Sequence, residues 1–299
     1  MTILTWPYFG EIMAFFTAIF WAMAVIFFKK SGETVHPIGL NIFKGLLSLI
    51  LVGLTMWLAG NEFLFDCPRD DYLMLLLSGV IGIGLADTFF FHSLNLLGAG
   101  LSAIVDCMYS PFVISLSMIF LGESMSAVQI LGVFLIIVAV LTATHPKHSA
   151  HVSRKNLIWG MFWGITAMGC MAISIVMVKP ILHKAPLLWI TQIRTIGGLV
   201  SLAIIVGLLK DKRRILKSVF SAREWKYMFP ASFLGNYVSL ILWMAGMKYA
   251  QASTAAALNQ TSNVFIFVFA AIFLKEAITR EKTIGITLAL IGVLLVTFT

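Results

Sequence analysis

Long apolar runs, separated by short polar stretches, dominate the pattern of this chain. Each run is long enough to cross a hydrocarbon core of about 30 Å, which takes roughly 20 helical residues. Breaker residues beside charged ones, as in Lys29-Lys30-Ser31-Gly32, mark several ends. The pattern predicts ten membrane-spanning helices at residues 8–28, 37–58, 72–91, 100–121, 128–143, 156–178, 187–208, 225–247, 252–274 and 283–298.

Composition agrees with an all-α integral membrane protein. Apolar residues make up 60% of the chain, charged residues 11%, and the mean hydropathy is +0.97. Such a chain cannot form one soluble core with a wettable surface, and no stretch is left for a folded soluble domain. The first apolar run lacks the basic start and small-residue cleavage site of a signal peptide, so we expect it to be retained.

The chain repeats itself. Segment 121–132 recurs, with substitutions, as segment 274–285. We therefore expect a first five-helix repeat at 1–144, an inter-repeat loop at 145–155 and a second repeat at 156–299. Because five is an odd number of spans, the second repeat enters the membrane from the opposite side, as in inverted-repeat transporters.

The residues of these repeats resemble a known family. They include a Leu-Gly-Glu element with Pro111 ahead of it and Gly132 after it, and a basic residue early in the second helix of each repeat, Lys44 and Arg194. This set resembles the ten-helix EamA branch of the drug/metabolite transporter superfamily, over nearly the whole chain. The resemblance implies an inverted-repeat bundle that transports small metabolites, commonly as an exporter, and it implies no particular substrate.

The sequence departs from the family pattern at two positions. Lys275 precedes the second-repeat glutamate where the first repeat has Gly122, and Val264 stands where a partner of Pro111 is expected. The family is usually described with both termini in the cytoplasm.

Loop charges predict the opposite orientation. The N-terminus, the loops after the second, fourth, sixth and eighth helices, and the C-terminus hold four basic residues: Arg69, Lys179, Lys184 and Lys248. The remaining loops hold Lys29, Lys30, Lys147, Arg154, Lys155, Lys210, Lys212, Arg213, Arg214, Lys217, Arg223, Lys226, Lys275, Arg280 and Lys282. By the positive-inside rule the second set is cytoplasmic and both termini lie outside a cell (inner) membrane.

Several other functions are disfavoured. The basic loops do not interleave aromatic residues as a nucleic-acid surface does, and no nucleotide-binding glycine motif is present. His145, His148 and His151 recur every three residues but have no Cys or carboxylate nearby, so no metal or other cofactor is expected. A membrane enzyme would need a convergent nucleophile and base, which are not evident.

Three ionisable residues are predicted to share one layer inside the membrane. Lys44 lies about seven residues into its helix, roughly 10 Å below the surface, and Asp106 and Asp87 lie at a similar depth. Since one lysine cannot neutralise two carboxylates, either one Asp is protonated or the layer holds a negative charge that a proton or cationic group fills. The alternative is a buried ion pair with the other Asp in a wet vestibule. His92 is a candidate proton relay.

The second repeat carries different polar residues at the matching places. Arg194 stands 150 residues after Lys44, and Asn259 stands 153 after Asp106, beside Gln260 and Asn263. With no acidic residue at its depth in either adjacent helix, Arg194 is a candidate receptor for a carboxylate or phosphate. The alternatives are that it snorkels to the surface or bonds backbone carbonyls.

Weaker candidates complete the set. Trp21 and Tyr109 either line a cavity or pack elsewhere, and Glu11 is expected at the interface. Glu123 and Glu276, each ahead of the last helix of its repeat, are expected to stabilise that helix's N-terminus, with gating as the alternative.

The sequence therefore predicts a secondary transporter of small polar metabolites, with export of an amino-acid-like compound as the leading case. The alternative is transport of a lipid or other amphiphile along the seam between the repeats. Expected partners are the small-molecule substrate and membrane lipids, without nucleic acid. The oligomeric state is not predicted.

Overall fold

The computed structural model describes residues 8–121, 126–143, 152–182, 184–220, 225–250 and 258–298, and the regular structure within these ranges is helical. The first half contains α1 (Phe9–Ser31), α2 (Pro37–Leu58), α3 (Arg69–Gly79), η2 (Val80–Ala86), α4 (Asp87–Leu97), α5 (Ala99–Asp106), α6 (Tyr109–Leu121) and α7 (Ala127–Ala143). The second half contains α8 (Arg154–Val178), α9 (Leu187–Leu208), α10 (Lys212–Val219), α11 (Trp225–Ser232), η4 (Phe233–Val238), α12 (Ser239–Tyr249), α14 (Ser262–Phe273) and α15 (Arg280–Phe298). The all-α prediction is confirmed.

Most predicted spans correspond to observed helical stretches. In the described residues, seven stretches are long and apolar enough to cross a membrane: Phe9–Ser31, Pro37–Leu58, Arg69–Leu97, Ala99–Phe120, Arg154–Val178, Leu187–Leu208 and Trp225–Gly246. Ala127–Thr142 and Leu258–Phe273 are shorter apolar helices, and α15 is a further helix of 19 residues. The third span was predicted to end at residue 91 but continues to Leu97. The number of ten spans stays a prediction.

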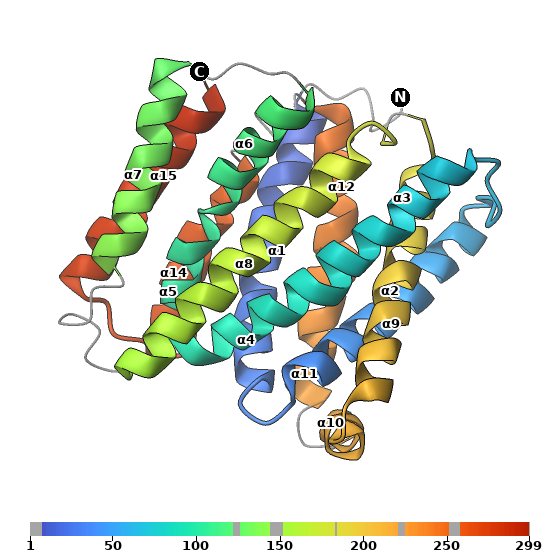
Figure 1. Cartoon of the computed structure of the whole chain (residues 1–299), viewed down its shortest axis with the longest axis horizontal. Coiled ribbons are helices and arrows are strands. Elements are labelled where there is room, and N and C mark those ends of the chain that lie inside the picture. Colours follow the sequence, from blue (N-terminus) through green and yellow to red (C-terminus); the bar gives the residue numbers. More distant parts are fainter. Residues whose placement is uncertain are drawn as a thin grey trace.

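The helices form one tilted bundle (Figure 1). α1 packs against α12 and α14, α4 against α8, and α9 against α2 and α3, so elements of the two halves alternate through the bundle. α7 and α15, the last helices of the two halves, pack against each other at one side of it. α1 begins and α15 ends on the same face, as expected of two halves of opposite orientation.

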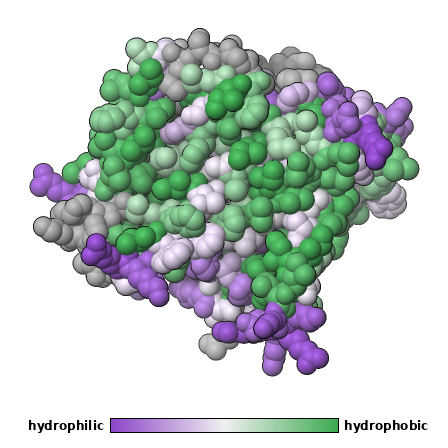
Figure 2. All heavy atoms as spheres, in the orientation of Figure 1, coloured by the Kyte–Doolittle hydropathy of each residue, from purple (hydrophilic) through white to green (hydrophobic). Residues whose placement is uncertain are grey.

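The surface separates into an apolar belt and polar ends. Figure 2 shows apolar residues over the broad side of the molecule and hydrophilic residues at its edges. The exposed large apolar side chains include Ile50 (63% exposed) and Phe134 (60% exposed), as expected of positions that face lipid. We call the face where α1 ends and α8, α10 and α15 begin the basic face, and the opposite one the terminal face.

The third and eighth spans change from α- to π-helix at matching places. η2 begins at Val80 and η4 at Phe233, 153 residues later, so the irregularity belongs to the repeat. π-helical turns are rare and often occur at functional sites. Both segments lie in the interior of the bundle, where backbone groups need partners.

One face of α2 bonds to both π segments. Asn41 Nδ2 donates to the carbonyl oxygen of Ile83 in η2 at 2.6 Å. Two turns further on, Ser48 Oγ donates to the carbonyl oxygen of Asn236 in η4 at 3.0 Å. Lys44 lies between these two positions, and it is therefore held at the junction of the two halves.

Candidate functional site

A cavity of about 220 Å³ lies between the two π segments. Its lining comes from both halves, including Gly82 and Ile83 of η2 and Gly235 and Asn236 of η4. The structure brings nine of the sequence-predicted site residues to this cavity: Trp21, Lys44, Asp87, Asp106, Tyr109, Arg194, Asn259, Gln260 and Asn263. Their role in binding or coupling stays a prediction.

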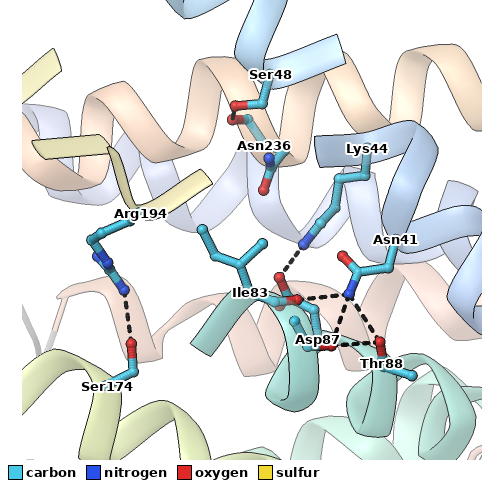
Figure 3. Close-up of polar contacts among 10 residues, drawn as sticks. Asn41, Lys44, Ser48, Ile83, Asp87, Thr88, Ser174, Arg194 and Asn236 are labelled. Atoms are coloured by element: carbon cyan, nitrogen blue, oxygen red, sulfur yellow. Dashed lines mark hydrogen bonds and ion pairs between the residues drawn. The ribbon is translucent and has the colours of Figure 1, made fainter. Parts of the chain in front are cut away.

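Lys44 and Asp87 form a buried ion pair. The Lys44 ammonium bonds to Asp87 Oδ2, and both side chains are almost fully shielded, at 1% and 8% exposure. The ammonium also lies 5.3 Å from the centre of the Phe91 ring. A charge at this depth is retained only with a partner, and here each group neutralises the other. Figure 3 shows Lys44 descending from α2 onto Asp87 at the start of α4.

Asp106 lies apart from this pair. It is the last residue of α5, and the chain kinks at Cys107 and Met108 before α6 begins. Asp106 lines the cavity, and in the described part of the chain no hydrogen bond or ion pair engages its carboxylate. The arrangement corresponds to the ion-pair alternative: one Asp is paired with Lys44, and the second faces the cavity without a cation.

Arg194 has a different environment from Lys44. Its side chain is 6% exposed, and Nη2 donates to Ser174 Oγ of α8 at 3.0 Å (Figure 3). Its Nε is buried without a hydrogen-bond partner. Among the described residues, no carboxylate forms an ion pair with this guanidinium. It is therefore a buried cation beside a cavity with donor capacity left over.

Glycines explain how Arg194 is placed. α3 crosses α9 so closely that a Cβ on Gly79 would lie 1.9 Å from the Arg194 carbonyl oxygen. A Cβ on Gly82 would lie 2.3 Å from Ser174 Oγ, the partner of the guanidinium. Ser174 Oγ in turn donates to the carbonyl oxygen of Ser78 at 2.8 Å. A side chain at Gly79 would push α9 away, and one at Gly82 would displace Ser174 of α8, so either would disturb the position of Arg194.

A polar network joins the fourth and ninth spans. Gln260 Nε2 donates to Ser110 Oγ at 2.9 Å, and Asn263 Nδ2 donates to Cys107 Sγ at 3.3 Å. With the offset of 153 residues between the repeats, Gln260 is the counterpart of Cys107 and Asn263 is the counterpart of Ser110. Each bond therefore joins the same two repeat positions, with the roles of the two halves exchanged, as in the interface of a two-fold symmetric dimer. Asn263 Nδ2 also bonds Gln260 Oε1 at 2.9 Å. Asn259, one residue before this network, lines the cavity.

Aromatic and sulfur-containing side chains form much of the remaining wall. Trp21 of α1 packs against Phe90 with ring centres 6.1 Å apart, and both line the cavity. Tyr109, Met168 and Trp243 also line it. The cavity thus combines a few charged groups with a largely apolar wall, the usual character of a small-molecule site.

Other candidates lie elsewhere. His92 is exposed, packs edge-on against Trp163 at 5.5 Å and does not line the cavity. Glu11 is half-buried in the first turn of α1. Glu123 and the histidines at 145, 148 and 151 lie outside the described residues.

Glu276 does cap a helix, but not the one that was expected. Its carboxylate accepts the N–H of Ala99 at 2.7 Å and the N–H of Gly100 at 3.0 Å, at the start of α5 in the other half. The expectation of a cap on α15 is wrong because the chain folds back between α14 and α15, bringing Glu276 against α5. Lys282 Nζ lies 4.0 Å from Glu276 Oε2. This cluster ties the two halves together at the basic face.

The polar cavity and junction residues that sequence reasoning missed include Asn41, Ser48, Asn236 and Ser239. Asn236 and Ser239 line the cavity, and Asn236 Nδ2 and Ser239 Oγ are buried without a partner. A signal was available, because Asn41 and Ser48 lie on the same helical face as Lys44.

Comparison with known proteins gives the same fold. A solved crystal structure superposes with a TM-score of 0.68 at 12% identity, covering 97% of this chain and 96% of that one. The chain is 23% identical to an uncharacterized transporter of Archaeoglobus fulgidus, over 95% of this chain and 96% of the relative. It is 22% identical to an uncharacterized transporter of Methanothermobacter thermautotrophicus, over 96% and 85%. It is 24% identical to a chloroplastic WAT1-related protein of Arabidopsis thaliana, over 93% and 67%.

The family comparison identifies both halves. The sequence pattern of the EamA-like transporter family matches residues 8–144 and, a second time, residues 158–298. These segments together cover most of the chain, and each contains one copy of the repeat. The family and the relatives from Archaeoglobus fulgidus and Methanothermobacter thermautotrophicus are transporters rather than enzymes. The chain belongs to the EamA-like transporter family, within the drug/metabolite transporter superfamily, and is a multi-pass membrane protein.

Proposed function

We propose that this transporter moves a small polar metabolite, with export of an amino-acid-like compound as the leading case. The cavity lies between the two halves, and alternating access would expose it to each face in turn. Toward the basic face the bundle is filled by buried Phe28, Phe91 and Leu94. α5 packs against α14 near that face, whereas α6 packs mainly on α8 toward the terminal face. The fourth and ninth spans thus pack together near the basic face and separate toward the terminal face, and this supports a passage that opens on one face at a time.

The observation that carries the proposal is the state of Arg194. It is buried beside the cavity, its Nε has no partner, and its Nη2 bonds only a neutral hydroxyl. A planar guanidinium can hold a carboxylate with two parallel hydrogen bonds. Arg194 would hold the anionic group of the substrate, with the amides of Asn259, Gln260 and Asn263 as further polar contacts. Trp21, Tyr109 and the methionines would contact the apolar part.

Asp106 is the proposed site of coupling or of contact with a cationic group. Its carboxylate faces the cavity without a cation in the described structure, unlike that of Asp87. A proton or the amino group of a substrate would neutralise it. Asp106→Asn should abolish the dependence of transport on a pH gradient while the protein still inserts and folds. An unchanged pH profile in that variant would assign Asp106 a structural role.

The basic face is the proposed cytoplasmic face, with both termini outside. It carries Lys29, Lys30, Arg154, Lys155, the basic residues of α10, Lys275, Arg280 and Lys282. The other face carries Arg69, Lys179, Lys184 and Lys248 among the described residues. A C-terminal alkaline phosphatase fusion should be active. An inactive phosphatase together with a fluorescent C-terminal fusion would reverse the orientation.

The decisive experiment concerns Arg194. A thermal-shift screen of purified protein against amino acids, sugars, nucleotides and lipids first identifies ligands, because a bound ligand raises the melting temperature. Arg194→Lys keeps the charge but removes the planar fork, so it should weaken binding of an anionic ligand by about 1–3 kcal/mol. Arg154→Lys, at an exposed arginine at the start of α8, is the matched control. Wild-type affinity in Arg194→Lys and Arg194→Gln would place the binding site elsewhere.

A further inference from the structure

The short helix α10 lies across the bundle rather than along it. Figure 1 looks down its axis, whereas the spanning helices run through the same view lengthwise. It connects the end of α9 with the start of α11 on the basic face. Within its eight residues stand Lys212, Arg213, Arg214 and Lys217. This position and composition set α10 apart from the loops on the terminal face.

The inner side of α10 is fixed to the bundle. Ile215 and Val219, one turn apart, are buried and pack toward α2 and α9. A Cβ on Gly39 of α2 would lie 2.8 Å from Val219 Cγ2, so the two helices are in close contact. Ser218 Oγ accepts the backbone N–H of His36 at 3.2 Å. α10 is thus held in place by packing and by a hydrogen bond.

The outer side combines basic and apolar side chains. Lys212, Arg213, Arg214 and Lys217 are all exposed, and no described carboxylate forms an ion pair with them. Leu216 (42% exposed) lies on the helix, and Phe220 (73% exposed), four residues later, directly follows its end. Exposing two large apolar side chains to water alone is unfavourable. A helix that lies in the membrane interface carries this combination.

We propose that α10 is a binding surface for anionic phospholipids in the leaflet at the basic face. Arg213, Arg214 and the two lysines contact the headgroup phosphates, and Leu216 and Phe220 enter the boundary of the acyl chains. Basic clusters beside a membrane span attract anionic lipids, and guanidinium groups bind phosphate with paired hydrogen bonds. A soluble phosphate would use the charges but not the apolar pair. The surface is separate from the cavity, so this inference does not rest on the proposed substrate.

Lipid retention tests the proposal directly. Purified protein in a nonionic detergent is mixed with dioleoylphosphatidylglycerol or dioleoylphosphatidylcholine, and bound lipids are counted by native mass spectrometry. The wild-type protein should retain phosphatidylglycerol in preference to phosphatidylcholine. K212Q/R213Q/R214Q/K217Q should retain phosphatidylglycerol roughly tenfold more weakly, because each basic residue near the headgroups contributes to binding. Raising the salt concentration should weaken retention by the wild type.

A matched variant distinguishes lipid binding by α10 from a general effect of positive charge on this face. R154Q/K155Q/K275Q/R280Q removes four exposed basic residues from the same face without touching α10. It should retain phosphatidylglycerol within about twofold of the wild type. Equal losses in both quadruple variants, or wild-type retention in the α10 variant, would overturn the proposal. If the α10 variant does not fold, R213Q/K217Q serves as the test, with R154Q/K155Q as its control.

The apolar pair distinguishes a lipid from a soluble anion. L216S/F220S keeps every charge but removes the contact with the acyl boundary, so it should lower phosphatidylglycerol retention several-fold. Glycerol 3-phosphate at millimolar concentration should not displace the lipid from the wild type. Displacement by glycerol 3-phosphate together with wild-type retention by L216S/F220S would show that α10 binds phosphate groups of any source, against the proposal.

Discussion

The two halves of the molecule hold a cation at matching positions but neutralise it in different ways. In the first half, Lys44 is paired with Asp87 and the pair is buried. In the second half, Arg194 bonds the hydroxyl of Ser174, and position 240, which is 153 residues after Asp87, is a leucine. The duplication therefore keeps the backbone, including its π segments, while the charges diverge. An ion pair stabilises one half, and a cation with spare donors faces the cavity from the other.

Breaking the ion pair should have the largest effect on stability. Asp87→Asn leaves the Lys44 ammonium buried without a counter-ion, so we expect a loss of about 3–5 kcal/mol in the free energy of unfolding. Denaturant unfolding of the purified protein in detergent measures it. The double variant Lys44→Met, Asp87→Leu gives this half the leucine of the other and should recover most of the loss, since it leaves no unpaired charge. Additive losses in the double variant would contradict the pairing.

Removing the helix cap supplied by Glu276 should have the second-largest effect on stability. Glu276→Gln replaces a carboxylate that accepts two backbone N–H groups of α5, and charged hydrogen bonds contribute about 1.5–3 kcal/mol. We expect a loss toward the lower end of this range, because the side chain is 20% exposed. Glu62→Gln, at an exposed glutamate, is the control. The same stability in both variants would show that the contact at the basic face contributes little.

Replacing Arg194 should change the stability of the protein much less than replacing Lys44. Arg194→Met removes a buried cation that has one neutral partner, so the lost hydrogen bond is offset by the relief of desolvation. We expect the free energy of unfolding to change by no more than about 1 kcal/mol. Lys44→Met, which leaves the Asp87 carboxylate buried and unpaired, should cost about 3–5 kcal/mol. Equal losses in the two variants would remove the distinction between the halves.

The sequence predicted the repeat and most span boundaries, because twenty-residue apolar runs and a duplicated segment are local signals. It also selected nine residues that meet at one cavity, since depth along a helix follows from counting residues. The π segments were not predictable, because neither stretch contains a residue that requires an i to i+5 bond. Asn41 and Ser48 lie on the face of α2 that carries Lys44, but the carbonyl groups to which they bond could be found only with the three-dimensional contacts. Glu276 was assigned to the wrong helix for the same reason, since its partner lies in the other half.

The starts of the second helices provide the smallest contrast between the halves. α2 begins after His36, whose Nδ1 accepts the N–H of Ile38 at 3.3 Å, whereas α9 begins after Pro186 without a side-chain cap. Burial, His92 and Arg214 lower the pKa of His36 below its usual 6.5, with Asp211 acting in the opposite direction. A lowered pKa favours the neutral imidazole in the folded protein. Its stabilising contribution is therefore present above pH 6.5 and is lost as the pH falls through the folded-state pKa.

The pH dependence at His36 can be isolated with one substitution. Asn is also a good N-cap but does not titrate, so His36→Asn should match the wild type at pH 8 and lose less stability between pH 7 and pH 5. The difference should be about 0.5 kcal/mol or less, because the side chain is exposed and solvent screens its charge. Melting temperatures of both proteins across this range give the measurement. Parallel curves would mean that protonation of His36 does not weaken the start of α2, and that the halves do not differ there.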